Sequence, residues 1–136
     1  MWKYKDLGAP NESSTPAVAD GIVYEGSDDY NVYALNATTG ALVWKYATLG
    51  PVNSSPRIAN GVVYVASEDE HFYALDAQTG SLLWQYTMGS YSAPPIVTDG
   101  TIYLSANAIY EFALPNMPGP SPAPRIKMLH PTPGIH

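Results

Sequence analysis

The chain has no cysteine among its 136 residues, which excludes disulfide bonds and thiolate metal sites. No apolar run approaches the roughly 18 residues that a membrane helix needs, so no membrane insertion is expected. The first residues, MWKYKDLGAP, lack the apolar core of a signal peptide. Basic residues are also scarce, with 6 Lys and Arg against 12 Asp and Glu. Because an acidic protein repels phosphate backbones, we expect no nucleic-acid partner.

Aromatic and turn-forming residues are abundant instead, with 11 Tyr, 11 Gly and 13 Pro. The phrase ALNATTGALVWKY (34–46) returns as ALDAQTGSLLWQY (74–86). The rest of the chain follows the same pattern, because three sets of landmarks recur every 39 to 40 residues: Pro16, Pro56 and Pro95; Gly21, Gly61 and Gly100; Tyr24, Tyr64 and Tyr103. This spacing predicts three copies of one structural unit.

Each copy is predicted to form four short strands. The dipeptides Asp20-Gly21 and Asn60-Gly61 favour a tight hairpin, because its turn needs positive φ angles. Apolar runs such as IVYEGS and NVYALNA follow, and ALVWKYA completes the unit. Four antiparallel strands at this period are typical of a β-propeller blade, and blades stack to cover their apolar faces. The expected fold is therefore all-β, with three four-stranded antiparallel blades in residues 1–114, closed or extended by self-association, and a Pro-rich tail in residues 115–136.

The pattern Ala34-x-Asn36-x-x-x-Gly40-x-x-x-Trp44 and its copy from Ala74 to Trp84 resemble the tryptophan-docking motif of PQQ-like (quinoprotein-type) propeller repeats. This family includes BamB-like proteins and other secreted repeat proteins. The resemblance implies that each Trp packs between neighbouring blades, that the Ala leaves room for it and that the Gly turns the chain. It also implies an extracellular or cell-envelope location, with a cytoplasmic location as the alternative because the chain shows no signal peptide.

The third copy lacks its Trp. Ala113 and Gly119 keep the motif spacing, but Ala123 stands at the Trp position within a proline-rich stretch. Proline cannot donate to a strand ladder, so an interior strand is excluded there, and an outermost strand would have no Trp. Meanwhile Trp2-Lys3-Tyr4 matches Trp44-Lys45-Tyr46. We therefore predict that residues 1–7 supply the fourth strand of one blade. The predicted blade-docking residues are Trp2, Ala34, Gly40, Trp44, Ala74, Gly80, Trp84 and Ala113.

Other candidate sites are weaker. The acidic turns SDD (27–29) and SEDEH (67–71) have the oxygen ligands that calcium prefers, but no Asp-x-Asp-x-Asp-Gly pattern occurs, and we interpret them as hairpin turns without metal. Three Asn-x-Ser/Thr triplets are candidates for glycosylation, at Asn11, Asn36 and Asn53. No catalytic residues and no cofactor are expected.

Three blades are fewer than the four to eight of a closed propeller, and the terminal blades would leave apolar faces bare. The leading hypothesis is a non-catalytic structural module that forms a homo-oligomer, as a ring or filament, by blade stacking and terminal strand exchange. The alternative is a protein- or ligand-binding or sensor segment of a larger extracytoplasmic propeller with a protein partner. The weakest hypothesis is a fragment of a PQQ-dependent dehydrogenase.

Overall fold

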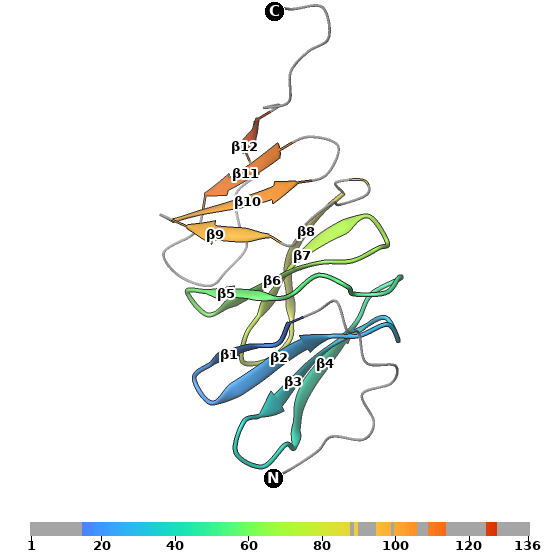
Figure 1. The fold of residues 1–136 in the computed structure, drawn as a ribbon, viewed down its shortest axis with the longest axis vertical. Helices are drawn as coiled ribbons and strands as arrows, with labels where there is room; N and C mark the ends of the chain where they lie inside the picture. The colour runs from blue at the N-terminus through green and yellow to red at the C-terminus, as the bar shows by residue number, and fades with distance from the viewer. Residues whose placement is uncertain are drawn as a thin grey trace, which may run out of the picture.

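Three four-stranded antiparallel sheets stack along the long axis of the molecule in a computed structural model (Figure 1). The structure describes residues 15–87, 89, 95–98, 100–105, 109–113 and 125–127. Within these ranges the chain is all strand and turn, which confirms the prediction of propeller blades. None of the described residues forms a helix long and apolar enough to cross a membrane.

Each sheet is one copy of the repeat. The first contains β1 (Ala17–Ala19), β2 (Ile22–Gly26), β3 (Asn31–Asn36) and β4 (Leu42–Ala47). The second contains β5 (Arg57–Ala59), β6 (Val62–Ala66), β7 (His71–Asp76) and β8 (Leu82–Thr87). The third contains β9 (Ile96–Thr98), β10 (Thr101–Ser105), β11 (Ile109–Ala113) and β12 (Arg125–Lys127). We call them the first, second and third blades.

The predicted hairpins at Asp20-Gly21 and Asn60-Gly61, in the first two blades, have the expected backbone. Asp20 and Asn60 both have φ of 51°, and the glycines that follow have φ of 77° and 76°. Two consecutive positive φ angles define the turn whose twist matches that of the flanking strands. The Asp-Gly and Asn-Gly dipeptides therefore fix where each blade begins.

The fourth strand of the third blade comes from the tail. β12 pairs antiparallel with β11 at the edge of the sheet, with Ile126 opposite Tyr110. It starts directly after Pro124, the last proline of the run 115–124, so all three of its residues keep their N–H groups. The sequence had assigned a fourth strand to residues 1–7, which lie outside the described residues. Within the third blade described here, β12 holds that position.

The third blade also differs from the alignment of the repeats in its register. Tyr24 pairs with Ala34 and Tyr64 with Ala74, but Tyr103 pairs with Glu111. Ala113, which the sequence aligned with Ala34 and Ala74, lies opposite Thr101. Residues 106–108 join the two strands, where residues 27–30 and 67–70 do so in the other blades. The residue opposite Tyr103 lies two positions earlier than the residues opposite Tyr24 and Tyr64, and a shift of two preserves the face of each side chain.

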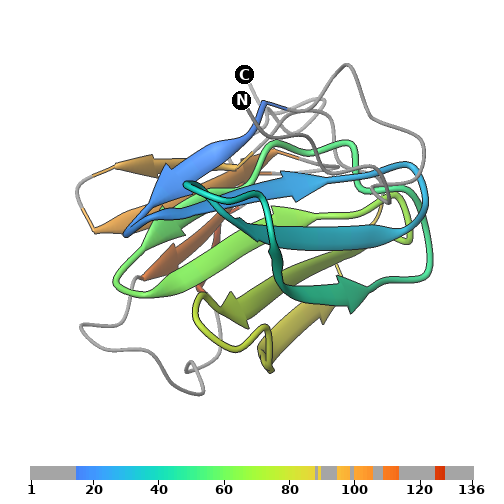
Figure 2. The same ribbon diagram turned by 90° about the horizontal axis from the view of Figure 1, so that it is seen from below.

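The core consists of two layers, one between each pair of neighbouring blades. Viewed along the stack, the three sheets lie over one another (Figure 2). The first layer joins Tyr24, Ala34 and Trp44 to Val63 and Leu75. The second joins Tyr64, Phe72 and Ala74 to Ile102 and Leu104. The middle blade is therefore covered on both faces, and its strand β6 is buried at every residue.

Candidate blade-docking site

The indole ring of Trp44 is buried at the interface between the first and second blades. Its Nε1 donates a hydrogen bond to the carbonyl oxygen of Ala77, 2.9 Å away. A Cβ atom built on Gly80 would lie 2.6 Å from Cδ2 of this ring. The ring thus rests directly on the backbone of Gly80, and a residue with a side chain would collide with it. The resemblance implied that Trp44 packs between blades and that Gly80 turns the chain, but it gave no contact between the two.

Tyr24 shares the same acceptor. Its hydroxyl donates to the carbonyl oxygen of Ala77 at 2.9 Å, and its ring centroid is 5.9 Å from that of Trp44. Burial, with smaller contributions from the charges of Asp20 and Asp76, raises the pKa of Tyr24 to about 12. One carbonyl of the second blade therefore binds two aromatic side chains of the first. The sequence marked Tyr24 as a repeated landmark but did not indicate this contact.

The turn that carries Ala77 is held in shape by Asp76. Its Oδ1 accepts hydrogen bonds from the amides of Gln78 and Thr79, at 2.8 and 3.1 Å. The amide of Gly80 donates to the carbonyl oxygen of Asp76 at 2.8 Å, with Gly80 at φ 78°. The motif thus has a physical reason at each end: the acidic residue closes the turn, and the Gly permits its left-handed exit.

The first blade forms the same turn at the end of the stack of described blades. Asn36 Oδ1 accepts from the amides of Thr38 and Thr39, at 2.8 and 2.9 Å. Gly40 has φ 78°, and its amide donates to the carbonyl oxygen of Asn36 at 2.8 Å. The docking turn is therefore formed on the first blade, although the structure describes no blade before it. Glycosylation at Asn36 stays a prediction, and here its side-chain oxygen stabilises the turn.

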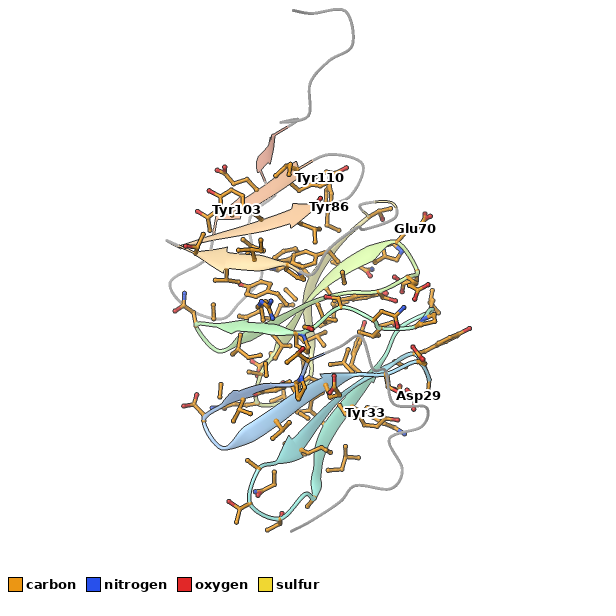
Figure 3. All side chains as sticks on the ribbon, viewed as in Figure 1. Asp29, Tyr33, Glu70, Tyr86, Tyr103 and Tyr110 are labelled. Carbon is orange, nitrogen blue, oxygen red and sulfur yellow. The ribbon has the colours of Figure 1, made fainter. Side chains whose placement is uncertain are left out.

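The second interface repeats the aromatic cluster. The ring of Trp84 packs against those of Tyr64 and Phe72, with centroids 6.1 and 5.7 Å away. Tyr86 meets Tyr110 edge-on at 5.7 Å, which joins β8 to β11 (Figure 3). The hydroxyl of Tyr64 is buried and has no hydrogen-bond partner among the described residues, and burial raises its pKa to about 12. Tyr24 occupies the equivalent position and has its partner.

Across each sheet, one row of paired residues faces the next blade. The row of the first blade contains Ala17, Tyr24, Ala34 and Trp44. The row of the second blade contains Arg57, Tyr64, Ala74 and Trp84. The corresponding pairing in the third blade joins Ile96, Tyr103, Glu111 and Arg125. We call these the forward rows. An Ala–Trp pair in the first two blades is thus replaced by Glu111 and Arg125 in the third.

A second row in each sheet faces the preceding blade. In the second blade it contains Ile58, Val63, Leu75 and Leu82, and Val63 and Leu75 are buried against the first blade. In the first blade it contains Val18, Val23, Leu35 and Leu42. We call these the rear rows. The rear row of the first blade is as apolar as that of the second.

The carboxylates of the two acidic turns accept hydrogen bonds from backbone amides and tyrosine hydroxyls of the same blade. Asp69 Oδ1 accepts from the amide of His71 at 2.9 Å, and Oδ2 accepts from the hydroxyl of Tyr73. Burial, followed by the hydrogen bond to Asp69 and the charge of Asp69, raises the pKa of Tyr73. Asp29 repeats this arrangement with Tyr33 (Figure 3). Within the described residues no group of three His, Cys, Asp or Glu side chains could hold a metal ion. This geometry favours the interpretation as structural turns.

The remaining predicted site residues are only partly covered by the structure. Trp2 and Asn11 lie outside the described residues, and their roles stay predictions. Asn53 is partly buried in the connection between the first two blades, and its glycosylation also stays a prediction. Sequence reasoning missed the carbonyl group of Ala77, since every residue has one and no side chain marks it.

Comparison with known proteins identifies the family of the chain. A family model described as outer membrane protein assembly factor BamB matches residues 1–113. The chain belongs to this family of PQQ-like repeat propellers. In the curated proteins, tetrathionate hydrolase of Acidithiobacillus ferrooxidans is 51% identical over 35 residues, which are 26% of this chain and 7% of that protein.

Solved structures support the same fold. BamB from Moraxella catarrhalis has a TM-score of 0.67 and 22% identity, over 84% of this chain and 36% of BamB. A europium-containing methanol dehydrogenase has the same TM-score and identity, over 83% of this chain and 24% of the enzyme. Quinohemoprotein alcohol dehydrogenase ADHIIG from Pseudomonas putida HK5 has a TM-score of 0.64 and 26% identity, over 85% of this chain and 20% of the enzyme. The chain thus spans about a third or less of each of these relatives.

Proposed function

We propose that the chain is a non-catalytic propeller module that associates with a second copy through the rear row of its first blade. The observation that carries this proposal is the duplication of a buried interface on a terminal face. In the rear row of the second blade Val63 and Leu75 are buried under the first blade, whereas Leu82 is 39% exposed. The first blade repeats that row in Val18, Val23, Leu35 and Leu42, of which Leu35 is buried and Val18 and Leu42 are exposed. Buried apolar side chains of this size contribute roughly 1.5–3 kcal/mol each.

Exposure at matched positions supports this proposal. Val18 is 66% exposed, whereas Ile58 at the same place in the second blade packs against the first interface. Val23 is partly buried, whereas Val63 is fully buried. A second copy that covers this face would remove Val18 and Val23 from water. Two copies that meet through this same row form a closed two-fold pair, because each copy then covers the row of the other.

The docking turn of the first blade gives the predicted strand exchange a specific acceptor. Trp44 precedes its acceptor Ala77 by 33 residues. Trp2 precedes Ala37, the equivalent residue of the first blade, by 35 residues. We propose that Trp2 docks on this turn and that its strand presents an edge to the second copy. A second copy alone would then cover the rear row of the first blade.

Absolute mass in solution tests this proposal. Light scattering on a size-exclusion column should give twice 14.6 kDa for the wild type and 14.6 kDa for Val18→Asp. Ile96→Asp is the matched control, since Ile96 is 57% exposed at the opposite end of the stack and should leave the mass unchanged. Trp2→Ala should weaken the pair. A wild type that is monomeric at every concentration would overturn the proposal.

The proposed absence of catalysis rests on how the tryptophans are used. Trp44 binds the second blade, and Trp84 packs against the core cluster shared by the second and third blades. The resemblance implies a similar packing role for Trp2. We therefore propose no cofactor. Addition of pyrroloquinoline quinone and calcium should produce neither bound quinone absorbance nor alcohol oxidation. Either signal, at one equivalent of quinone per chain, would contradict the non-catalytic assignment.

A second candidate function is a segment of a larger BamB-like propeller in the cell envelope that contacts a protein partner. The observation that favours it is coverage, since the chain spans 36% of the Moraxella catarrhalis BamB. In that case a preceding blade of the same protein would cover Val18 and Val23. Fusion of one additional PQQ-like blade before residue 1 would then raise the melting temperature, and this gain would be lost in Val18→Asp.

A further inference from the structure

The two interfaces between blades hold their repeated tyrosines differently. At the first interface the hydroxyl of Tyr24 donates a hydrogen bond to the carbonyl oxygen of Ala77 on the neighbouring blade. At the second interface Tyr64 has the same place in the repeat and is fully buried, and its hydroxyl has no hydrogen-bond partner among the described residues. Burial of a hydroxyl without a partner is unfavourable, because its bonds to water are lost and not replaced. The second interface therefore carries a cost that the first does not.

The docking tryptophans differ in the same direction. Trp44 has only 7% of its surface exposed, and its Nε1 donates to the neighbouring blade. Trp84 packs against the second core layer but is only partly buried. Its ring stacks with those of Tyr64 and Phe72, which belong to its own blade. The second interface thus leaves more of its docking ring in contact with solvent.

The connection between the first two blades is also fastened to the acidic turn of the second. The amide of Leu49 donates to Asp69 Oδ2 at 3.0 Å. The hydroxyls of Thr48 and Ser67 are both buried and lie 3.2 Å apart. In the third blade the corresponding turn has the sequence Ala-Asn-Ala (106–108), which contains neither a carboxylate nor a hydroxyl. The side-chain chemistry that fastens the second blade is therefore absent from the sequence of this turn.

Separation of the blades has opposite consequences at the two interfaces. When the third blade moves away from the second, water reaches the hydroxyl of Tyr64 and satisfies it, which favours the open state. When the first blade moves away, Tyr24 loses its hydrogen bond to Ala77, and Trp44 loses both its hydrogen bond and its contact with Gly80. Local opening of a protein follows the interface that costs least to separate, which here is the second one.

We propose that the third blade opens away from the second as a unit while the first blade stays docked, and that the hydroxyl of Tyr64 sets how often it opens. Each blade of a stack contacts only its neighbours, so one terminal blade can separate without unfolding the others. Opening breaks the edge-on contact between Tyr86 and Tyr110 (Figure 3) and exposes Phe72 and Trp84. The inference does not rest on association with a second copy.

Hydrogen–deuterium exchange of the full chain, followed by mass spectrometry of its peptides, measures the opening of each blade. In the wild type, peptides from β9 and β10 should exchange faster than the matched peptides from β1 and β2. Tyr64→Phe should slow exchange in β9 and β10 by about fivefold or more, because the unsatisfied hydroxyl is gone from the closed state. The matched control Tyr24→Phe should speed exchange in β1 and β2 by about fivefold and leave β9 and β10 unchanged. A Tyr64→Phe variant that does not slow exchange in the third blade would overturn the proposal.

Pairing through the first blade would protect that blade and produce the same order of exchange for a different reason. The comparison is therefore repeated in Val18→Asp, which removes the proposed pairing. Faster exchange of the third blade than of the first in this variant would show that the asymmetry belongs to the single chain. Equal exchange of both blades in Val18→Asp would overturn this inference, whatever the mass of the wild type. The mass of the wild type decides the proposed function separately.

Discussion

Replacement of Gly80 by Ala tests whether the Trp44 ring really rests on the backbone of the neighbouring blade. Gly80 has φ 78°, and its added Cβ would lie 2.6 Å from Cδ2 and 2.7 Å from Cε3 of Trp44. Two costs therefore add: the left-handed backbone of an L-residue and the collision with the ring. The first is about 1–2 kcal/mol, and overpacking in a filled interface typically costs about 1–3 kcal/mol.

Gly21→Ala separates the two costs. Gly21 has φ 77°, almost the same as Gly80, but nothing lies within 4 Å of its added Cβ. This variant should therefore lose only the backbone cost of about 1–2 kcal/mol. Gly80→Ala should lose about 2–5 kcal/mol in total. Equilibrium unfolding in urea, monitored by circular dichroism, measures both values on the same scale.

The cycle with Trp44→Ala completes the test. Once the ring is gone, Gly80→Ala should cost no more than Gly21→Ala, because only the backbone term remains. Equal costs of the two glycine variants in the wild-type background would refute the reasoning. An excess at Gly80 that persists without the ring would show that the collision involves other atoms than those of Trp44.

Three further predictions concern the buried tyrosines and the acidic turns. Tyr24→Phe should lower the free energy of unfolding by about 1 kcal/mol, because it removes the hydrogen bond to Ala77. Tyr64→Phe should be neutral or stabilising, because that hydroxyl has no partner among the described residues. Urea unfolding compares the two variants, and equal losses would contradict the difference. Folding raises the pKa of both tyrosines from 10.0 to about 12, so these groups ionise first in the unfolded chain. Stability should therefore fall as the pH rises from 10 through 12. Melting temperatures that stay level across this range would contradict the burial of both hydroxyls. Asp69→Asn should destabilise the protein by about 1–3 kcal/mol, because Asp69 accepts hydrogen bonds from two amides and from Tyr73. At the exposed Asp28, the control Asp28→Asn should change stability by less than about 0.5 kcal/mol. A similar loss in both variants would refute the structural role of the turn.

The repeat made most of the fold predictable. Asp20-Gly21 and Asn60-Gly61 locate the hairpins, and the spacing of Ala34, Gly40 and Trp44 locates the interface between blades. These signals work because side chains with special backbone or packing requirements recur at fixed positions.

The third blade was less predictable, for physical reasons. The number of residues between Tyr103 and Ala113 equals that between Tyr64 and Ala74, so the alignment aligned Ala113 with Ala74. The register instead places Glu111 opposite Tyr103, a shift of two residues that no residue pattern marked. β12 was missed because three residues carry too little periodicity to predict a strand. Its position depends on the edge of β11, a partner that only the fold supplies.

The hydrogen bond from Trp44 to the carbonyl of Ala77 also has a kinetic consequence. It joins residues 33 apart, and each interface forms between blades that are consecutive in the chain. During folding, each blade that has formed can therefore provide the docking surface for its neighbour in the sequence. The middle blade is packed against a neighbour on both faces, so its backbone amides should exchange their protons most slowly. The amides of the two outer blades should exchange faster, through opening of a single blade. The molecule then has a gradient of local opening built into its linear order, with the slowest region at its centre.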